Sequence, residues 1–200
     1  AEKKRLVVLV SQQEHCLYDL LARWHSKELD VEIPCVISNH ETFRGFVEWH
    51  GIPFHHVPVT ADNRHEANAE ILRLFEQSRG DIMVLARYMQ ILPPELCEKY
   101  PGRIINIHHS FLPSFKGANP YRQAHARGVK LIGATAHFVT SDLDEGPIIE
   151  QNVVRVDHSR TATQLVAIGQ DEESRTLRQA VTWFAEHRVL LDGARTIIFR

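Results

Sequence analysis

Short apolar runs of strand length alternate with longer amphipathic segments along this chain, and that alternation restricts the folds open to it. The first run, residues 6–10, reads Leu-Val-Val-Leu-Val and is typical of a strand buried on both faces. The expected strands lie at residues 6–10, 31–37, 52–57, 81–86, 103–107, 132–139, 147–156 and 196–199. The expected helices lie at residues 11–26, 41–50, 64–78, 93–99, 120–127 and 161–186. This order predicts an α/β fold, a doubly wound and mostly parallel sheet with helices on both faces.

No repeat, low-complexity tract or linker interrupts the pattern, so residues 1–200 are expected to form a single domain. Lys and Arg number 23 against 25 Asp and Glu, so there is no basic excess to neutralise phosphates and no nucleic-acid partner is expected. The apolar runs are only strand-sized, so no membrane segment is expected either. Three widely spaced cysteines without a C-x-x-C pair favour a reducing compartment, and the cytoplasm is the expected location.

The segment 104–110 carries polar side chains at the carboxyl end of an expected strand, which is where open α/β sheets bind ligands. Asn106 and His108 are two residues apart, so an extended chain puts both on one face. An amide donor can hold a developing oxyanion, and an imidazole can move a proton near neutral pH. Taken alone, these residues also fit a capped strand end with solvated histidines, and the pattern leaves both interpretations open.

Two further clusters could serve the same edge of the sheet. The acidic turn 142–147 contains Asp144, a carboxylate able to orient a histidine or activate water, although an ordinary acidic turn fits as well. His137 in the preceding strand is by itself typical of a core histidine. The segment 85–92 offers apolar walls and backbone groups to a flat heterocycle, or is simply a strand-to-helix turn.

Thirteen histidines raise the question of a metal site. They are scattered, and only the pairs at 55–56 and 108–109 are adjacent. Neighbouring histidines in a strand point to opposite faces, so neither pair is expected to chelate an ion, and no metal is expected.

Three motifs stand together in this chain, Asn106-Ile107-His108, Ser110-Phe111-Leu112-Pro113 and Asp144-Glu145-Gly146-Pro147. In combination they resemble the formyltransferase family that uses 10-formyltetrahydrofolate. The similarity extends over about residues 5–199, and the combination of motifs is far more specific than any one of them. Those that favour the hydrolytic, deformylating branch are Ala86-Arg87-Tyr88-Met89-Gln90, Ser114-Phe115-Lys116-Gly117-Ala118-Asn119-Pro120-Tyr121 and Leu131-Ile132-Gly133-Ala134-Thr135-Ala136-His137.

The resemblance implies the family's Rossmann-like fold and the hydrolysis of 10-formyltetrahydrofolate to tetrahydrofolate and formate, without a metal or another cofactor. It implies that Asn106 and His108 stabilise the oxyanion, that Asp144 orients His108, and that His137 supports Asp144 or its loop. No catalytic residue is expected in residues 158–180. The residues expected to bind the folate are Arg87, Tyr88, Met89, Gln90, Ile91, Leu92, Val139 and Thr140.

A departure from the family pattern suggests which molecule accepts the formyl group. Transformylases that act on glycinamide ribonucleotide have a Gly-Ser-Asn-type loop after the first strand, whereas this chain has Ser11-Gln12-Gln13-Glu14-His15. Ser11 and Glu14 have the spacing of a capping box, which would satisfy amide donors, and Glu14 would repel a phosphate. Water is therefore the expected acceptor, and the alternatives are an amine-directed formyltransferase and a silent folate-binding module. A homo-oligomer is expected, and the amino-terminal regulatory domain usual in this branch is expected to be absent from the chain.

Overall fold

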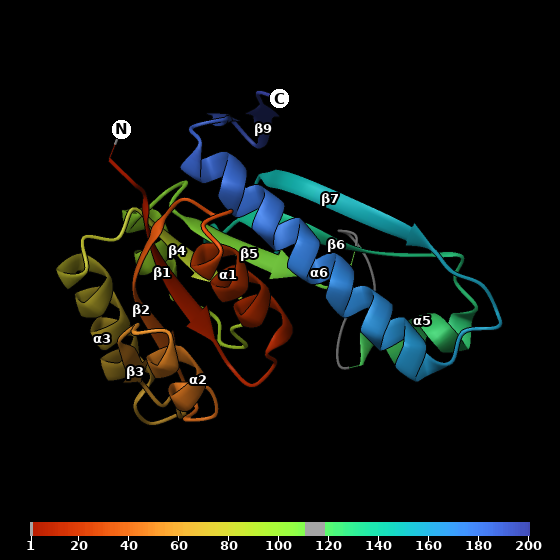
Figure 1. Ribbon diagram of the computed structural model, residues 1–200, viewed down its shortest axis with the longest axis horizontal. Helices are drawn as coiled ribbons and strands as arrows, with labels where there is room; N and C mark the ends of the chain where they lie inside the picture. The colour runs from red at the N-terminus through yellow and green to blue at the C-terminus, as the bar shows by residue number, and fades with distance from the viewer. Residues whose placement is uncertain (1, 111–118) are drawn as a thin grey trace.

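The computed structural model describes residues 2–110 and 119–200 and shows a seven-stranded sheet with helices on both faces (Figure 1). The strands lie in the order β3-β2-β1-β4-β5-β6-β7. Their bounds are β1 Arg5–Val10, β2 Glu32–Ser38, β3 Phe54–His56, β4 Ile82–Leu85, β5 Ile104–His108, β6 Leu131–Phe138 and β7 Ile148–Arg155. The helices are α1 His15–His25, α2 Arg44–Trp49, α3 Arg64–Gln77, α4 Pro94–Lys99, α5 Pro120–Arg127 and α6 Ala162–Ala185.

The sheet is parallel from β3 to β5, and its last two strands are antiparallel. The predicted α/β, mostly parallel fold is thus confirmed. The five parallel strands end at one edge of the sheet, where loops distant in sequence meet. Because β6 is antiparallel and Phe138 lies opposite Ile105, the turn between β6 and β7 begins beside the start of β5. The register sets Leu85 opposite Asn106, and Asn106 opposite His137, which brings three strands together at the level of the expected site.

The core lies in two layers because successive side chains of a strand point to opposite faces. In β1, Val7 and Leu9 pack toward α3 and α4, whereas Leu6, Val8 and Val10 pack toward α1, α2 and α6. All five are fully buried. The long helix α6 crosses the sheet over β5, β6 and β7 (Figure 1).

The start of α1 differs from the expectation. The helix begins at His15, and no side chain caps it, so the predicted capping box is wrong. The Ser11 hydroxyl instead donates to Asn39 Oδ1 at 2.8 Å and accepts from the Met89 amide at 2.8 Å. Ser11 is buried at the sheet edge, where these two partners satisfy its hydroxyl better than a helix terminus exposed to water.

The carboxyl-terminal segment forms a hairpin of two strands, β8 Val189–Asp192 and β9 Arg195–Ile198. Only the second strand was expected from the sequence. Gly193, with φ of +61°, makes the tight turn between them, and a glycine between two apolar runs is the signal that predicts such a turn. The elements α2 and β3 are shorter than expected, and β3 pairs with β2 over only three residues at the sheet edge.

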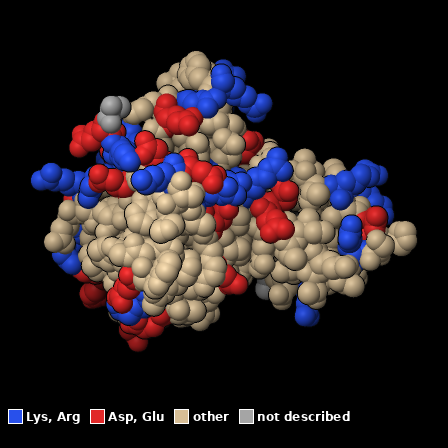
Figure 2. Space-filling view, viewed as in Figure 1, with Lys and Arg blue, Asp and Glu red and all other residues tan. Residues whose placement is uncertain are grey.

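The charged side chains on the face shown in Figure 2 are mixed, with Lys and Arg interspersed among Asp and Glu. Within residues 2–110 and 119–200, no helix has the length and apolar character needed to cross a membrane.

Candidate active site

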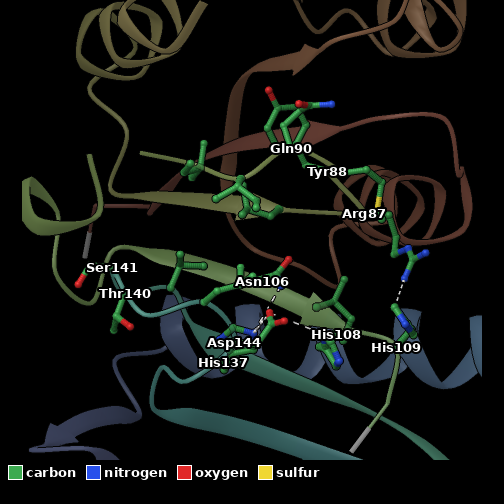
Figure 3. A pocket seen from close by; sticks show the side chains of 17 residues that line it. Arg87, Tyr88, Gln90, Asn106, His108, His109, His137, Thr140, Ser141 and Asp144 are labelled. Carbon is green, nitrogen blue, oxygen red and sulfur yellow. Dashed lines mark hydrogen bonds and ion pairs between the residues drawn. The ribbon is translucent and has the colours of Figure 1, made fainter. Parts of the chain in front are cut away.

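A cavity of about 250 Å³ opens at the carboxyl ends of β4 and β5, facing the loop after β6 (Figure 3). Every residue proposed from the sequence as catalytic, supporting or folate-binding lines it. These are Arg87, Tyr88, Met89, Gln90, Ile91, Leu92, Asn106, His108, His137, Val139, Thr140 and Asp144. The lining is completed by Leu85 of the expected segment 85–92, by Ser141 and Leu143 of the loop 139–144 that was also expected to contact the folate, and by Ile107 and His109, which were not proposed as site residues.

Asn106 and His137 face each other because they are paired across β5 and β6. His137 Nδ1 lies 2.9 Å from the Phe138 carbonyl oxygen, which can only accept, so Nδ1 carries the proton. Burial lowers the pKa of His137, which keeps the ring neutral and leaves Nε2 as an acceptor. Asn106 Nδ2 donates to this atom at 3.4 Å. The Asn106 amide nitrogen is therefore turned to the catalytic side, and its second hydrogen is available to an oxyanion.

Asp144 reaches the same point from the turn between β6 and β7, where its backbone has φ of +57°. Its Oδ1 lies 3.7 Å from His108 Nδ1 and 3.9 Å from His137 Nε2. Figure 3 shows the three side chains converging with Asn106. A left-handed backbone is uncommon for a side-chain-bearing residue, and Asp is one of the few that tolerate it. The turn thus holds a carboxylate against the histidine that it would orient.

His108 is poised for proton transfer. Burial lowers the pKa of His108 below its ordinary value, Asp144 opposes this shift, and the neighbouring His137 adds to it. The ring is neutral at neutral pH and able to accept a proton, and the Asp144 carboxylate can stabilise the imidazolium that results.

The segment 87–92, which is expected to bind the folate, has two kinds of residue. Met89 and Ile91 are largely exposed at the rim, as is Leu143 across the opening, so the mouth of the cavity is apolar. Tyr88 is 5% exposed and packs into the core, where burial raises its pKa to about 12. Apolar side chains at the mouth suit a flat heterocycle, while Tyr88 anchors the segment.

The pair His108–His109 does not behave as expected. Neighbouring strand histidines were predicted to point to opposite faces, but β5 ends at His108, and the two rings stack with centroids 4.9 Å apart and an interplanar angle of 18°. Among the described residues, no group of three or more His, Cys, Asp or Glu could hold a metal ion. Of the motifs noted in the sequence, residues 111–118 lie outside the described part of the chain.

One buried charge beside the site was missed. Glu173 of α6 is 1% exposed and accepts from Arg87 Nη1 at 2.8 Å, in a segment where no catalytic residue was expected. It shares a buried face of α6 with Gly169, Leu177 and Ala180. A carboxylate within such a stripe is the sequence signal that could have identified it.

Comparison with known proteins agrees with this geometry. A family model described as formyl transferase matches residues 4–181. The chain is 53% identical over 199 residues to the formyltetrahydrofolate deformylase of Corynebacterium sp. (strain P-1), covering 100% of this chain and 70% of that protein. The structure of a formyltetrahydrofolate deformylase from Pseudomonas syringae pv. tomato superposes with a TM-score of 0.97 and 55% identity, over 100% of this chain and 67% of that one.

A glycinamide ribonucleotide transformylase from Symbiobacterium toebii shares the fold at lower identity. Its TM-score is 0.91 and its identity 32%, over 99% of this chain and 95% of that one. The family model covers most of the chain, and the Corynebacterium relative matches all of it. On this evidence, the chain belongs to the formyl transferase family.

Proposed function

We propose that this protein hydrolyses 10-formyltetrahydrofolate to tetrahydrofolate and formate. The observation that carries the proposal is the convergence of Asn106, His108 and Asp144 on one cavity whose mouth is apolar. The identity to deformylases over the whole chain supports the same substrate.

The reaction follows from the protonation states of the site. Neutral His108 accepts a proton from water as the oxygen attacks the formyl carbon, and Asp144 stabilises the imidazolium formed. Asn106 Nδ2 donates to the oxyanion, which the imidazolium charge also stabilises. His108 then gives the proton to the folate nitrogen as the carbon–nitrogen bond breaks, so one water is consumed and formic acid leaves, which ionises to formate in solution. These groups need neither a metal nor another cofactor.

The test is formate release from 10-formyltetrahydrofolate by the purified chain without an amine acceptor. We expect steady release that persists in EDTA. Absence of release, with turnover appearing only when glycinamide ribonucleotide is added, would make the protein a transformylase. Folate binding without either reaction would make it a silent binding module. Loss of activity in EDTA would contradict the metal-free mechanism.

The choice of water as the acceptor is part of this proposal. Because α1 has no capping box, its amide donors are not occupied in the way the sequence suggested. The choice of water is supported instead by the exposed Glu14 carboxylate at the start of this helix. A carboxylate at that place repels a phosphate. Glycinamide ribonucleotide is accordingly expected not to inhibit formate release, and competitive inhibition would contradict this part of the proposal.

Gly146 is expected to be essential because the strands leave no room for a side chain there. A Cβ at this position would lie 1.7 Å from the Phe138 carbonyl oxygen. In Gly146→Ala the turn must move and carry Asp144 with it, and we expect kcat to fall about 100-fold, since a displacement of about 1 Å can cost that much. Formate release measured beside Gly45→Ala is the check. Gly45 lies in α2 with nothing within 4 Å of an added Cβ, so that control should remain active. Wild-type kcat in Gly146→Ala would contradict the prediction.

We also propose that residues 1–200 form one catalytic domain that acts in the cytoplasm as a homo-oligomer, without nucleic acid. The three cysteines are free and buried, as is usual for a reducing compartment. Exposed apolar side chains on the β8–β9 hairpin and on β7 support association of copies, and light scattering of the purified chain tests it. They are Ile148, Val153, Leu190, Leu191, Ile197 and, directly after β9, Phe199.

A further inference from the structure

A buried ion pair joins the folate-binding segment to α6. Arg87 Nη1 donates to Glu173 Oε1 at 2.8 Å, and the two side chains are 9% and 1% exposed. Taking two charges out of water is costly, and apolar side chains of similar size are often at least as stabilising. Such a pair beside a catalytic cavity therefore indicates a role in the reaction more than in stability.

The Glu173 carboxylate is fixed from several directions. Its Oε2 accepts from the Tyr121 hydroxyl of α5 at 3.1 Å and lies 3.4 Å from His15 Nε2 of α1. Burial alone raises the pKa of Glu173, but His15 and the Arg87 charge together hold that pKa below its usual range. The group is therefore ionised, and it presents a fixed negative charge to Arg87.

Arg87 passes this constraint to His109 and, through it, to His108. The same Nη1 donates to His109 Nδ1 at 2.9 Å, as the dashed line in Figure 3 shows. A guanidinium only donates, so His109 Nδ1 is unprotonated. Burial, with Arg87 and His108 nearby, lowers the pKa of His109 to about 4, so the ring is neutral at neutral pH. This neutral ring is the one stacked on His108.

Hydrogen bonds also fix the backbone of residues 87–89. Arg87 has a left-handed backbone with φ of +63°, and its carbonyl oxygen accepts from the Ser11 amide at 3.1 Å. The Ser11 hydroxyl accepts from the Met89 amide. The position of the Arg87 guanidinium is thus set by the backbone at one end and by Glu173 at the other.

We propose that Glu173 is a positioning residue for His108. Its carboxylate holds Arg87, Arg87 holds His109, and the stacked His109 ring fixes the face of His108 that Asp144 does not hold. This inference rests on the proposed function only for its kinetic consequences, because the titration of His108 can be followed without turnover.

The variant Glu173→Gln keeps the size of the side chain and removes its charge. We expect kcat for formate release to fall about 10- to 100-fold with little change in KM, because His108 loses its alignment while the cavity keeps its shape. The matched control is Asp19→Asn. It removes the charge from another ion pair of α6, Arg178 with Asp19 of α1 at 2.8 Å, away from the cavity, and should keep wild-type kcat.

The second readout is the titration of His108 by NMR of histidine-labelled protein. The Glu173 charge raises the pKa of His108, so its removal should shift the titration to lower pH, and Asp19→Asn should leave it in place. An unchanged His108 titration together with wild-type kcat in Glu173→Gln would overturn the proposal. Within residues 2–110 and 119–200, the charged and titratable groups around His108 are Asp144, His137, His109, Arg87 and Glu173.

Failure of the proposed function and failure of the Glu173 proposal give different results. If the wild-type protein releases no formate, the proposed function fails, and the NMR titration still decides whether Glu173 acts on His108. If Glu173→Gln does not fold, His109→Phe replaces it. This variant keeps a stacked ring but removes the acceptor for Arg87, so kcat should fall, and wild-type kcat there would overturn the proposal.

Discussion

Replacing Asp144 by Asn is expected to lower kcat for formate release by about two to four orders of magnitude, the usual contribution of a positioned acid–base group. Folate affinity should change little. Asn is isosteric, so the turn is kept, but the negative charge near His108 Nδ1 is lost. The imidazolium formed during water attack then has no counter-ion. Stopped-flow or steady-state formate release, with folate binding measured by fluorescence, checks both expectations.

The pH dependence of formate release by Asp144→Asn is expected to shift to lower pH. The Asp144 charge raises the pKa of His108 against the effect of burial, so without it the pKa of His108 falls further. A rate limb that depends on neutral His108 should therefore move to lower pH in Asp144→Asn. The control is Asp142→Asn, an exposed carboxylate of the same turn, which should behave like the wild type. Near-wild-type turnover in Asp144→Asn would remove Asp144 from the mechanism.

The second large effect is expected for Asn106→Leu, which has nearly the same shape but no amide. Loss of one oxyanion donor costs about 100- to 1,000-fold in kcat. The change also leaves His137 Nε2 without its donor, so a loss of about 1 kcal/mol in the free energy of unfolding should accompany it. Steady-state kinetics and chemical denaturation of the same preparation separate the two effects.

Asn152→Leu is the matched control for this variant. Asn152 is another partly buried strand asparagine, and its Nδ2 donates to Thr176 Oγ1 at 2.9 Å, outside the cavity. The two variants should lose similar stability, but only Asn106→Leu should lose kcat. An equal kcat in both would mean that Asn106 has a structural role and is not the oxyanion donor.

Much of the fold follows from local pattern. The strand cores and the long helices were predicted because burial on two faces selects continuous apolar runs, and burial on one face selects a helical stripe. Asn106 and His108 were placed on one face by the strand period alone, and both line the cavity. The pairing of Asn106 with His137 was not predictable, because register across 31 residues depends on the whole sheet.

Two local predictions were wrong because contacts with residues distant in sequence outweighed the local pattern. Ser11 and Glu14 have the spacing of a capping box, yet the Ser11 hydroxyl bonds to Asn39 and Met89 on neighbouring loops. The stacking of His109 on His108 depends on β5 ending at His108, and strand ends are the least predictable part of an element.

The sequence by itself determined the class of fold and, through combined motifs, predicted Asn106, His108 and Asp144, which the structure brings to one cavity. Only the tertiary structure decided how these groups meet and what holds them. Glu173 and Arg87 are 86 residues apart and form their buried pair because the sheet sets the end of β4 against α6. The physical reason is that periodicity and motifs record local preferences, whereas a buried charge is stabilised by partners that only the complete fold brings within hydrogen-bond distance.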